Sequence, residues 1–547
     1  MLQEMKLSKK KMAKATYKER HDALIDKLVV LQQQAREKQL GLVVLFEGWN
    51  GSGKGSRISD VIYELDARAT SVALSQPFDE KAAELFADLD TGVGNYNPFM
   101  KRFWEELGER GTITFYETGW YDLAEHALIA REHEEWKLRA RKKRSNPRMP
   151  LEKFVAKSFE PREELGGMTR ADMYLDSIES FERSLTDNGY LVIKFFMHIT
   201  KDTQRKRLED LYSDPATRWR VTDEELLRMS DYDALLPLYD ALIARSDYEF
   251  APWHVINGED KREANLEIAT VIVEALEAGL AAKDAKAAQP AAEVPVPAFS
   301  RFPTQTDYPR LEDVDHSLVL DRDEYKRLLK QEQKRLNKLE QEMYQQRVPL
   351  MIMYEGWDAA GKGGNIKRIA QALDARAYKI YPSPAPTKTE LAHPHLWRYW
   401  TRLPKAGHVG IYDRSWYGRV LVERVEGLAT PEEVARAYDE INEFERDMVD
   451  WGALLIKFWV DIDFDEQLRR FEDRQNTPEK QWKITNEDWR NRDKNPQYEV
   501  AVRDMFRLTS TTFAPWTILE SNDKLYARIK ALRTINEALE KRLGLED

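Results

Sequence analysis

The strongest constraint on the fold is an internal repeat of the chain. Residues 42–54 (LVVLFEGWNGSGK) recur as residues 350–362 (LMIMYEGWDAAGK), 308 positions later. Three further matches follow in the same order at an offset of 263 positions: residues 193–196 with 456–459, Trp219 with Trp482, and residues 251–253 with 514–516. An ordered series of matches is typical of a duplicated domain. The sequence therefore predicts two homologous halves.

The repeat also indicates where the domains begin and end. At 547 residues the chain is too long for one ordinary core. We predict a first domain at 1–280, a linker at 281–300 and a second domain at 301–547, because residues 281–297 are rich in Ala, Pro and Lys and lack a periodic apolar face. The falling offset places extra residues in the first domain. We assign them to the charged stretch 131–170 as a surface insertion, with polyanion binding by residues 139–144 as the alternative.

Both halves alternate strand and helix patterns. Each opens with a long polar helix, at about 17–38 and 322–347, followed by an apolar, β-branched run, a Gly-rich turn and a second helical pattern. Short apolar strands follow in the second half at 409–412, 454–460 and 516–519. This order predicts an α/β fold in which a parallel sheet is sandwiched by helices. Ligands of such sheets bind at the carboxyl ends of the strands.

Composition narrows the classes of function. The formal net charge is −11, so any phosphate-rich ligand has to be held by local basic clusters rather than by the field of the whole protein. The lack of cysteine excludes disulfides, thiolate metal sites and a thiol nucleophile. The N-terminus has no apolar core of signal-peptide length and no apolar run approaches a membrane span, so we expect a cytoplasmic protein without a membrane partner. The net negative charge and the lack of a recognisable DNA- or RNA-binding motif argue against nucleic-acid binding.

The Gly-rich turn of the second half carries a phosphate-binding pattern. Residues 356–362 (GWDAAGK) fit the spacing G-x-x-x-x-G-K between an apolar strand and a helix, the context that this motif requires. The glycines let backbone N–H groups and the helix N-terminus point at phosphate oxygens. The lysine would supply a charge to the phosphate that is transferred. The predicted phosphate-binding residues are Gly356, Ala359, Ala360, Gly361, Lys362, Gly363 and Gly364.

One departure from the usual motif points to carboxylates. Gly363 follows the lysine, where a Ser or Thr hydroxyl normally binds magnesium. Phosphoryl transfer still needs its charge neutralised. Asp358 lies within the turn and Asp413 ends a predicted strand, with Glu423 as a third candidate. We predict that these three bind metal; for Asp358 a turn-shaping role is the alternative.

Cations next to these carboxylates extend the predicted site. Arg414 follows Asp413 directly, and a guanidinium can clamp phosphate oxygens with two hydrogen bonds. A simple Asp–Arg ion pair is the alternative. A helical, turn-interrupted segment then carries Arg469, Arg470, Arg474, Lys480, Lys483, Arg490 and Arg492 among acidic residues. This segment is either a solvated surface or a helical lid that closes over phosphates.

Together these motifs resemble the polyphosphate kinase type 2 family. The resemblance rests on GWDAAGKGG, on DRSWYGRVLVERV and on residues 481–483 (QWK), and it spans about residues 325 to 528. It recurs, weakened, over the first half. The resemblance implies tandem P-loop kinase-like domains with a helical lid, magnesium (or manganese) as cofactor, and polyphosphate bound along a basic channel. For a duplicated chain it implies the conversion of AMP to ADP.

The resemblance also implies roles for single residues. Lys362 and Arg414 would contact phosphate, while Asp358 and Asp413 would act at the metal. Lid and substrate contacts would come from Arg470, Arg474, Lys483 and Arg490. Gly418 stands where many relatives have Asn, so we assign it no contact. The Pro-rich turn 382–387 would border the substrate cleft.

The first half departs from this pattern. Asn50 replaces the carboxylate of Asp358, while Glu117 and Thr118 replace Asp413 and Arg414. Loss of a carboxylate and of the clamping arginine removes charge stabilisation around the phosphoryl group. We predict a catalytically inactive first domain, although Glu117 could still bind metal.

The sequence favours a polyphosphate-dependent phosphotransferase that acts on AMP. The acceptor phosphate is ionised near neutral pH, so positioning and electrostatics would supply most of the rate. The alternatives are an ATP-dependent nucleotide kinase of the same fold, an enzyme that phosphorylates nucleoside diphosphates, and a non-catalytic polyphosphate-binding protein. The sequence does not rank AMP against GMP as acceptor. We expect a homo-oligomer.

Overall fold

The computed structural model describes residues 2–8, 10–73, 97–121, 124, 169–221, 232–288, 294–484 and 486–545. The chain divides into two compact units. The first takes in residues 1–78, 102–290 and 392–394, and the second takes in residues 79–101, 291–391 and 395–547. Most of the predicted insertion at 131–170 lies outside the described residues, so its predicted role stays untested.

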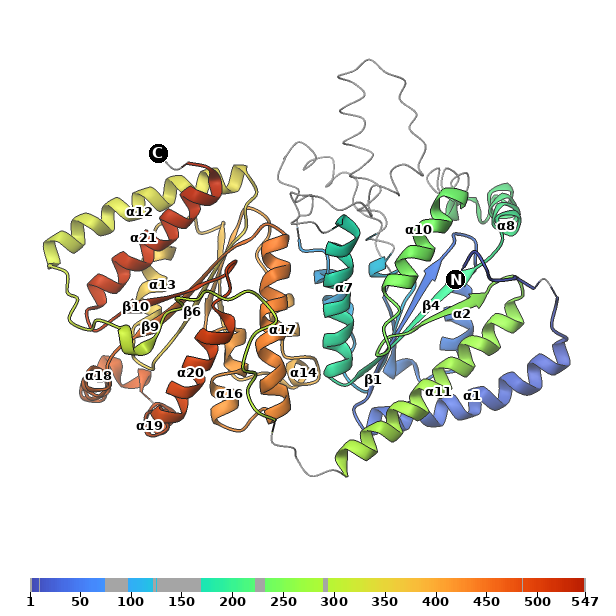
Figure 1. Ribbon diagram of the computed structural model, residues 1–547, viewed down its shortest axis with the longest axis horizontal. Helices are drawn as coiled ribbons and strands as arrows, with labels where there is room; N and C mark the ends of the chain where they lie inside the picture. Colours follow the sequence, from blue (N-terminus) through green and yellow to red (C-terminus); the bar gives the residue numbers. More distant parts are fainter. Residues whose placement is uncertain are drawn as a thin grey trace, which may run out of the picture. The chain divides into compact units, whose positions relative to one another are not determined.

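The first unit, coloured blue to green in Figure 1, is a parallel five-stranded sheet with the strand order β2-β3-β1-β4-β5. Its elements are α1 (Lys14–Glu37), β1 (Gly41–Gly48), α2 (Lys54–Ile62), β2 (Thr70–Ala73), α4 (Lys101–Glu106), β3 (Ile113–Tyr116), α7 (Arg170–Asp187), β4 (Tyr190–His198), α8 (Lys201–Ser213), α10 (Tyr232–Arg245), β5 (Trp253–Asn257) and α11 (Lys261–Ala287).

The second unit, yellow to red in Figure 1, repeats this plan with the order β10-β9-β6-β8-β7, again all parallel. Its elements are α12 (Arg322–Gln345), β6 (Leu350–Gly356), α13 (Lys362–Ala370), β7 (Tyr378–Pro382), α14 (Lys388–Leu391), α15 (Trp397–Trp400), β8 (Val409–Asp413), η5 (Trp416–Arg419), α16 (Val422–Val425), α17 (Pro431–Asp450), β9 (Leu454–Asp461), α18 (Phe464–Asn476), η6 (Pro478–Lys483), α19 (Asn486–Asp493), α20 (Asn495–Thr509), β10 (Trp516–Glu520) and α21 (Lys524–Leu543).

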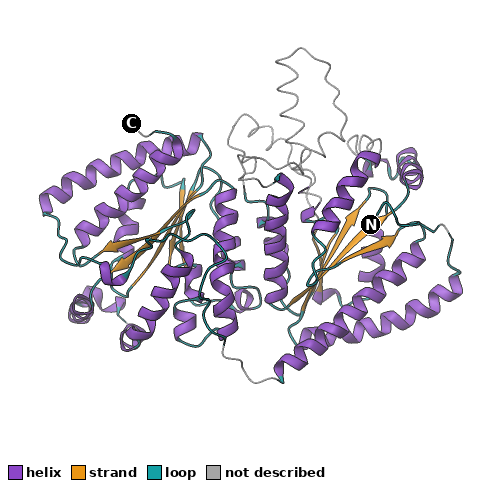
Figure 2. Cartoon of the chain, in the orientation of Figure 1, coloured by secondary structure: helices purple, strands orange, loops and turns teal. Residues whose placement is uncertain are grey.

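The two sheets confirm the predicted fold class and duplication. Read from β7, the second sheet has the order β7-β8-β6-β9-β10, which corresponds strand for strand to β2-β3-β1-β4-β5 of the first. Figure 2 shows helices on both sides of each sheet. The central strands β1 and β6 are therefore covered on both faces, which explains why both read as continuous apolar runs rather than as an alternating pattern.

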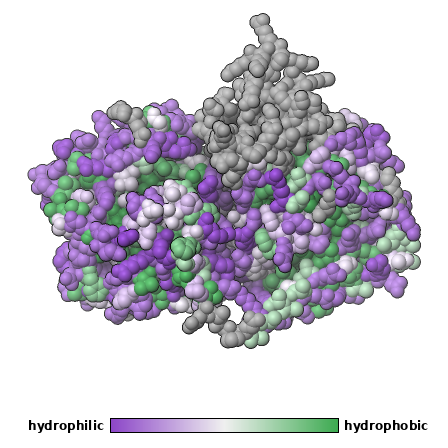
Figure 3. All heavy atoms as spheres, viewed as in Figure 1, coloured by the Kyte–Doolittle hydropathy of each residue, from purple (hydrophilic) through white to green (hydrophobic). Residues whose placement is uncertain are grey.

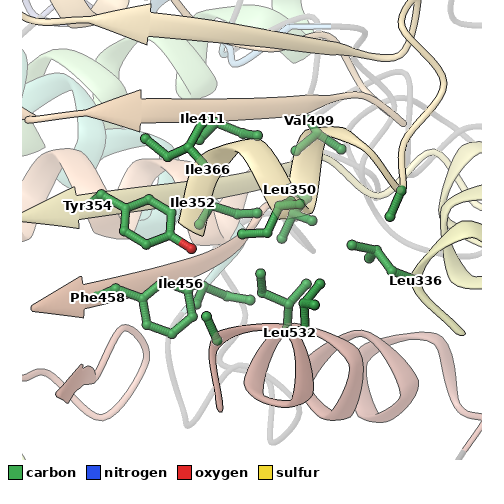
Figure 4. Close-up of a cluster of buried hydrophobic side chains, with 14 of the residues drawn as sticks. Leu336, Leu350, Ile352, Tyr354, Ile366, Val409, Ile411, Ile456, Phe458 and Leu532 are labelled. Carbon is green, nitrogen blue, oxygen red and sulfur yellow. The ribbon is translucent and has the colours of Figure 1, made fainter. Parts of the chain in front are cut away.

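The core of the second unit forms where α12, α13 and α21 pack on one face of the sheet. Leu350, Ile352 and Tyr354 of β6 are at most 1% exposed and meet Leu336 of α12 and Leu532 of α21 (Figure 4). Burial of each such aliphatic side chain contributes about 1.5–3 kcal/mol to folding. This packing holds the end of β6, where the Gly-rich turn begins.

The opposite side of the second sheet contains a fully buried ion pair. Lys457 of β9 donates to Glu445 Oε2 of α17 at 2.7 Å, to Tyr417 Oη at 2.8 Å and to the carbonyl of Thr509 at 2.7 Å. Trp416 Nε1 donates to the other oxygen of Glu445 at 3.0 Å. Burial lowers the pKa of Lys457, and Glu445 partly opposes that shift. The network holds Trp416 and Tyr417, which immediately follow the strand end that carries the site.

The same network recurs in the first unit. Lys194 donates to Glu182 Oε2 at 2.7 Å, to Tyr121 Oη at 3.1 Å and to the carbonyl of Ser246 at 2.6 Å. Burial raises the pKa of Glu182 and lowers that of Lys194. The duplication therefore extends to buried polar contacts as well as to the strand order.

The first part of the predicted linker is helical. Helix α11 continues through Ala287, so residues 281–287 are helical rather than extended. The stretch is rich in alanine, a strong helix former, and this local preference continues the preceding helix. The predicted domain boundaries themselves stay a prediction.

The surface agrees with a chain that is one-third charged. In Figure 3 the visible face mixes hydrophilic residues with smaller apolar areas. Of the helices in the described ranges, none combines the length and the apolar character needed to cross a membrane.

Candidate active site

The phosphate-binding turn of the second unit joins β6 to α13. Gly356 and Gly361 have φ angles of +142° and +116°, a backbone region that favours glycine. A Cβ on Gly356 would lie 2.3 Å from the carbonyl oxygen of Val460, so only glycine fits there. No side chain caps α13 at Gly361, which leaves the first turn of the helix as an anion-binding end. Beside Gly363 there is open space, since a Cβ there would meet nothing within 4 Å.

Lys362 begins α13 and lies against this turn. Its Nζ donates to the carbonyl of Gly356 at 2.6 Å and to that of Trp357 at 3.1 Å. Burial lowers the pKa of Lys362, and nearby Asp358 opposes this shift. Arg414 and Asp413 also act electrostatically on Lys362. The structure therefore brings the four predicted central residues into one cluster.

Asp358 is the centre of the polar contacts in this cluster. Its Oδ1 accepts from Nη2 of Arg414 at 3.0 Å, and its Oδ2 accepts from Nδ2 of Asn491 at 2.9 Å. Burial alone would raise the pKa of Asp358, but the charges of Lys362 and Arg414 and the two hydrogen bonds bring it below its usual value. The carboxylate is thus held ionised beside two cations. Asn491 is a site residue that the sequence analysis missed.

Arg414 adopts a backbone conformation that is unusual for its residue type. Its φ is +62°, a left-handed value that costs about 1–3 kcal/mol for a residue with a Cβ. Its N–H donates to the carbonyl of Tyr354 at 3.0 Å, and Ser383 Oγ donates to its carbonyl at 3.0 Å. These contacts hold the strained residue at the end of β8, directly after Asp413. Strain retained at a strand end is typical of a functional position.

Glu355 joins the ends of β6 and β8. Its Oε1 accepts from the N–H of Ser415 at 2.7 Å and from Ser415 Oγ at 2.8 Å. Burial raises the pKa of Glu355. In the first unit Glu47 accepts the N–H of Gly119 at 2.9 Å in the same way. The sequence analysis missed this role, although the repeat of Glu before the motif glycine was a usable signal.

A divalent metal fits this carboxylate arrangement only together with a phosphate ligand. Asp358 and Asp413 act on the same lysine, whereas Glu423 pairs with Arg419 Nε at 3.2 Å. Within the described ranges, no three His, Cys, Asp or Glu side chains gather closely enough to hold a metal ion. Mg²⁺, however, commonly binds through one or two carboxylates, with waters and substrate phosphates completing its shell. Two carboxylates beside a phosphate-binding turn satisfy that requirement.

A pocket opens beside Asp358 and Arg414. One wall is the Pro-rich turn, with Ser383–Pro386, and the adjoining Arg398 and Tyr399. The facing residues come from η5, α16 and the segment after it, and from α19 and α20: Gly418, Leu421, Val422, Glu423, Leu428, Asn491, Arg492, Asn495 and Tyr498. The pocket lining therefore combines charged side chains, such as Asp358, Arg398 and Arg414, with apolar ones, such as Leu421, Val422 and Leu428. An organic phosphate has both kinds of surface.

Comparison with known proteins assigns the family. The model of the polyphosphate kinase 2 family matches residues 11–144, 164–284 and 319–544. The chain belongs to the polyphosphate kinase 2 family. It is 37% identical over 523 residues to a polyphosphate:AMP phosphotransferase of Pseudomonas aeruginosa, covering 95% of this chain and 94% of the relative. It is 35% identical to a protein of the same description from Pseudomonas syringae pv. tomato, with the same coverage.

A solved structure extends the likeness to the whole fold. A crystal structure described as a polyphosphate kinase 2 from Pseudomonas aeruginosa matches with a TM-score of 0.75 and 34% identity, covering 97% of both chains. The family resemblance seen in the motifs is therefore confirmed over both halves.

Arg470, predicted to contact substrate from the lid, lies against the phosphate-binding turn of this polyphosphate kinase 2 chain. Its guanidinium is buried and donates to the carbonyls of Ala359 at 3.0 Å, Ala360 at 2.8 Å and Ser521 at 2.5 Å, while Nε donates to Glu466 at 2.5 Å. These donors are used within the protein, so Arg470 ties the phosphate-binding turn to α18.

Arg207 plays the same part in the first unit. It donates to the carbonyls of Gly51 at 3.1 Å, Ser52 at 3.2 Å and Gly258 at 2.8 Å. Arg207 and Arg470 occupy equivalent positions of the repeat, 263 residues apart. This match could have distinguished Arg470 from the other lid candidates in the sequence.

The remaining lid candidates are placed in different ways. Arg474 lies in the last turn of α18. Arg490 is 57% exposed and pairs with Glu426 at 3.7 Å. The side chain of Lys483 lies outside the described part of the structure. Contacts of these three residues with substrate stay a prediction.

The first unit keeps the turn but not the open space beside it. Lys54 donates to the carbonyl of Gly48 at 2.8 Å, as Lys362 does to Gly356. A Cβ on Gly55 would lie only 2.5 Å from Glu117 Oε1, whereas the equivalent Gly363 faces open space. The carboxylate of Glu117 therefore lies at the start of α2, where an anion would otherwise bind. Like-charge repulsion there disfavours phosphate binding.

Proposed function

We propose that the second unit transfers the terminal phosphoryl group of inorganic polyphosphate to AMP and so forms ADP. The main evidence is that Asp358, Lys362 and Arg414 lie together at a phosphate-binding turn and that Asp358 and Arg414 also line the adjoining pocket. Relatives that match nearly the full chain are described as polyphosphate:AMP phosphotransferases, which supports AMP as the acceptor.

In the proposed reaction an oxygen of the AMP phosphate attacks the terminal phosphorus of polyphosphate. The new P–O bond forms in line as the bond to the bridging oxygen breaks, and the shortened polyphosphate leaves with that electron pair. The attacking oxygen is already ionised near neutral pH, so no strong base is needed. Lys362, the start of α13 and Arg414 would hold the transferred group and stabilise its charge.

Asp358 and Asp413 are the residues that would hold magnesium, with manganese as the alternative. The metal would neutralise charge on the transferred phosphoryl group. Asp358 is suited to this position because the neighbouring cations hold its pKa below the usual value, after outweighing the effect of burial. Arg414 and Asn491, which hydrogen-bond the two oxygens of Asp358, would orient the carboxylate.

We further propose that the first unit is not catalytic. Asn50 and Thr118 stand where the second unit has Asp358 and Arg414, and Glu117 approaches the start of α2. These changes remove two of the four charged groups, one carboxylate and one guanidinium, that would surround a transferred phosphoryl group.

The decisive experiment measures ADP formation from AMP with polyphosphate or ATP as the sole donor, in the presence of magnesium. Lys362→Ala and Arg414→Ala should each lower kcat at least about 100-fold, the range expected for loss of one preorganised transition-state contact. Lys54→Ala, the matched change in the first unit, should retain the wild-type rate. Equal rates for Lys362→Ala and wild type would refute the proposed site. Turnover with ATP but not polyphosphate would instead support the nucleotide kinase.

Diphosphates are the acceptors to compare with AMP. Shorter relatives described as ADP- and GDP-polyphosphate phosphotransferases are 40–41% identical over 39–40% of this chain. We therefore include GMP, ADP and GDP in the acceptor panel, and expect AMP to give the highest kcat/KM. Cytoplasmic location and homo-oligomer formation stay predictions.

A further inference from the structure

Arg398 is a buried cation in the pocket wall with an unused donor. The residue lies in α15 and is 8% exposed. Nη1 donates to the carbonyl of Pro384 at 3.1 Å, but neither Nη2 nor Nε has a hydrogen-bond partner among the described residues. A buried donor without a partner costs about 1–3 kcal/mol, and more when it is charged. An arrangement of this kind needs a compensating contact, and a ligand in the pocket would supply it.

The charges behind Arg398 are unbalanced. Glu390 Oε1 lies 3.3 Å from Arg398 Nε and 2.5 Å from Arg402 Nη2, so one carboxylate serves two arginines. Both Glu390 and Arg398 are buried, which weakens screening by water. Among these three side chains one carboxylate faces two guanidinium groups, so one positive charge is left unmatched within the trio. This excess favours an anionic ligand over a neutral one.

The backbone around Arg398 is connected to the strand end that carries the site. Pro384, which accepts from Arg398, follows Ser383, whose N–H donates to the carbonyl of Asp413 at 3.1 Å. Tyr399 Oη donates to the carbonyl of Ser415 at 2.8 Å. These contacts join α15 and the Pro-rich turn to residues 413–415. Arg398 is thus held in a fixed position on the wall of the same pocket whose end is formed by Asp358 and Arg414.

We propose that Arg398 binds the phosphate group of the acceptor nucleotide and so selects phosphorylated acceptors. The inference rests on the proposed function, since it assigns a contact within the same pocket. A guanidinium edge with donors and no acceptor suits phosphate oxygens, and burial strengthens the hydrogen bond. In this assignment polyphosphate would bind at the turn and the start of α13 and would not contact Arg398.

The test separates the two substrates. Arg398→Met should raise KM for AMP about 10- to 100-fold, the effect of losing a charge-assisted hydrogen bond, and should leave KM for polyphosphate within about 2-fold. KM for GMP should rise by the same factor as KM for AMP, because both carry the same phosphate. Arg398→Lys, which keeps the charge, should recover part of the loss. Circular dichroism and thermal unfolding verify that the variants fold.

Arg402→Met is the matched control, because Arg402 shares Glu390 but does not line the pocket. It should change KM for AMP by less than about 2-fold if the effect of Arg398 is direct. An equal rise in Arg402→Met would show that only the shared ion pair matters and would overturn the proposal. A change in the AMP to GMP preference would point to base recognition and would also overturn it.

AMP binding measured by calorimetry makes the two hypotheses distinguishable. If the wild-type protein binds AMP but forms no ADP, and Arg398→Met binds AMP more weakly, the proposed function is refuted and the inference about Arg398 is kept. ADP formation with unchanged AMP affinity in Arg398→Met would refute the inference and keep the proposed function.

Discussion

Substitution of Lys457 by Met is expected to destabilise the second unit strongly. Lys457 and Glu445 have fully buried side chains whose charged atoms are 2.7 Å apart. In Lys457→Met, Glu445 keeps the hydrogen bonds from Trp416 Nε1 and Tyr417 Oη but loses its only cationic partner described in the structure. The carbonyl of Thr509 loses a donor as well. Methionine fills similar space, so the cost is mainly electrostatic.

The magnitude follows from these contacts. Removal of one partner from a buried ion pair costs about 3–5 kcal/mol, because the other charge stays buried without compensation. Within this cost, the loss of the donor to the Thr509 carbonyl contributes about 1–3 kcal/mol. We therefore expect Lys457→Met to lower the free energy of unfolding by about 3–5 kcal/mol. The double change Lys457→Met with Glu445→Leu should recover at least half of this loss, because no charge then stays buried.

Urea unfolding followed by tryptophan fluorescence and far-UV circular dichroism measures these changes. The matched variant is Lys194→Met, which breaks the equivalent pair with Glu182 in the first unit. It should lower the stability of the first unit by a similar amount without changing ADP formation. A loss below about 1 kcal/mol in Lys457→Met would refute the reasoning. Failure of the double variant to recover stability would refute the electrostatic explanation.

Three further predictions concern the turn. Asp358→Asn removes the charge at the centre of the cluster and should lower kcat about 100-fold or more, as measured by ADP formation. Its free energy of unfolding, measured by urea titration, should stay within about 1 kcal/mol of the wild-type value. Burial lowers the pKa of Lys362, so its positive charge is lost at a pH below the usual lysine range. We therefore expect kcat/KM to fall as the pH rises through that lowered pKa. In Lys362→Arg the fall in kcat/KM should move to higher pH. Arg470→Met should lower the free energy of unfolding by about 2–4 kcal/mol in thermal and urea unfolding, and should lower kcat, because the carbonyls of the turn lose their donors. The control is Arg469→Met at an exposed arginine, which should change the free energy of unfolding by less than about 0.5 kcal/mol. Equal effects of the two arginine variants would contradict this assignment.

Features that depend on local backbone requirements were predictable from sequence. The glycine spacing of residues 356–362 predicts a tight turn between a strand and a helix, and the structure has such a turn between β6 and α13, with positive φ at Gly356 and Gly361. Apolar runs at 409–412 and 454–460 predict the buried strands β8 and β9, which extend only one residue further. Such patterns are visible because each residue meets a requirement set by its own neighbours in the chain.

Contacts between distant segments were not predictable in the same way. Arg470 lies 111 residues from the carbonyl of Ala359 that it binds, and Asn491 lies 133 residues from Asp358. Within α18 both Arg470 and Arg474 are arginines of one amphipathic helix, and in sequence only the repeat separates them, since residue 207 is Arg and residue 211 is Leu. Burial and the direction of the side chain distinguish them, and both arise only when α18 packs on the turn.

The amino-acid sequence by itself determined that this chain holds two copies of one α/β plan and that the phosphate-binding turn of the second copy carries Asp358 and Lys362. Repeats, periodicity and glycine spacing are written along the chain, so they need no knowledge of packing. Only the tertiary structure decided that Arg470 supports the turn, that Glu117 closes the space beside α2, and that Arg398 offers an unused donor to the pocket. Those properties depend on which groups are excluded from water and which atoms face them, and folding alone brings these groups together.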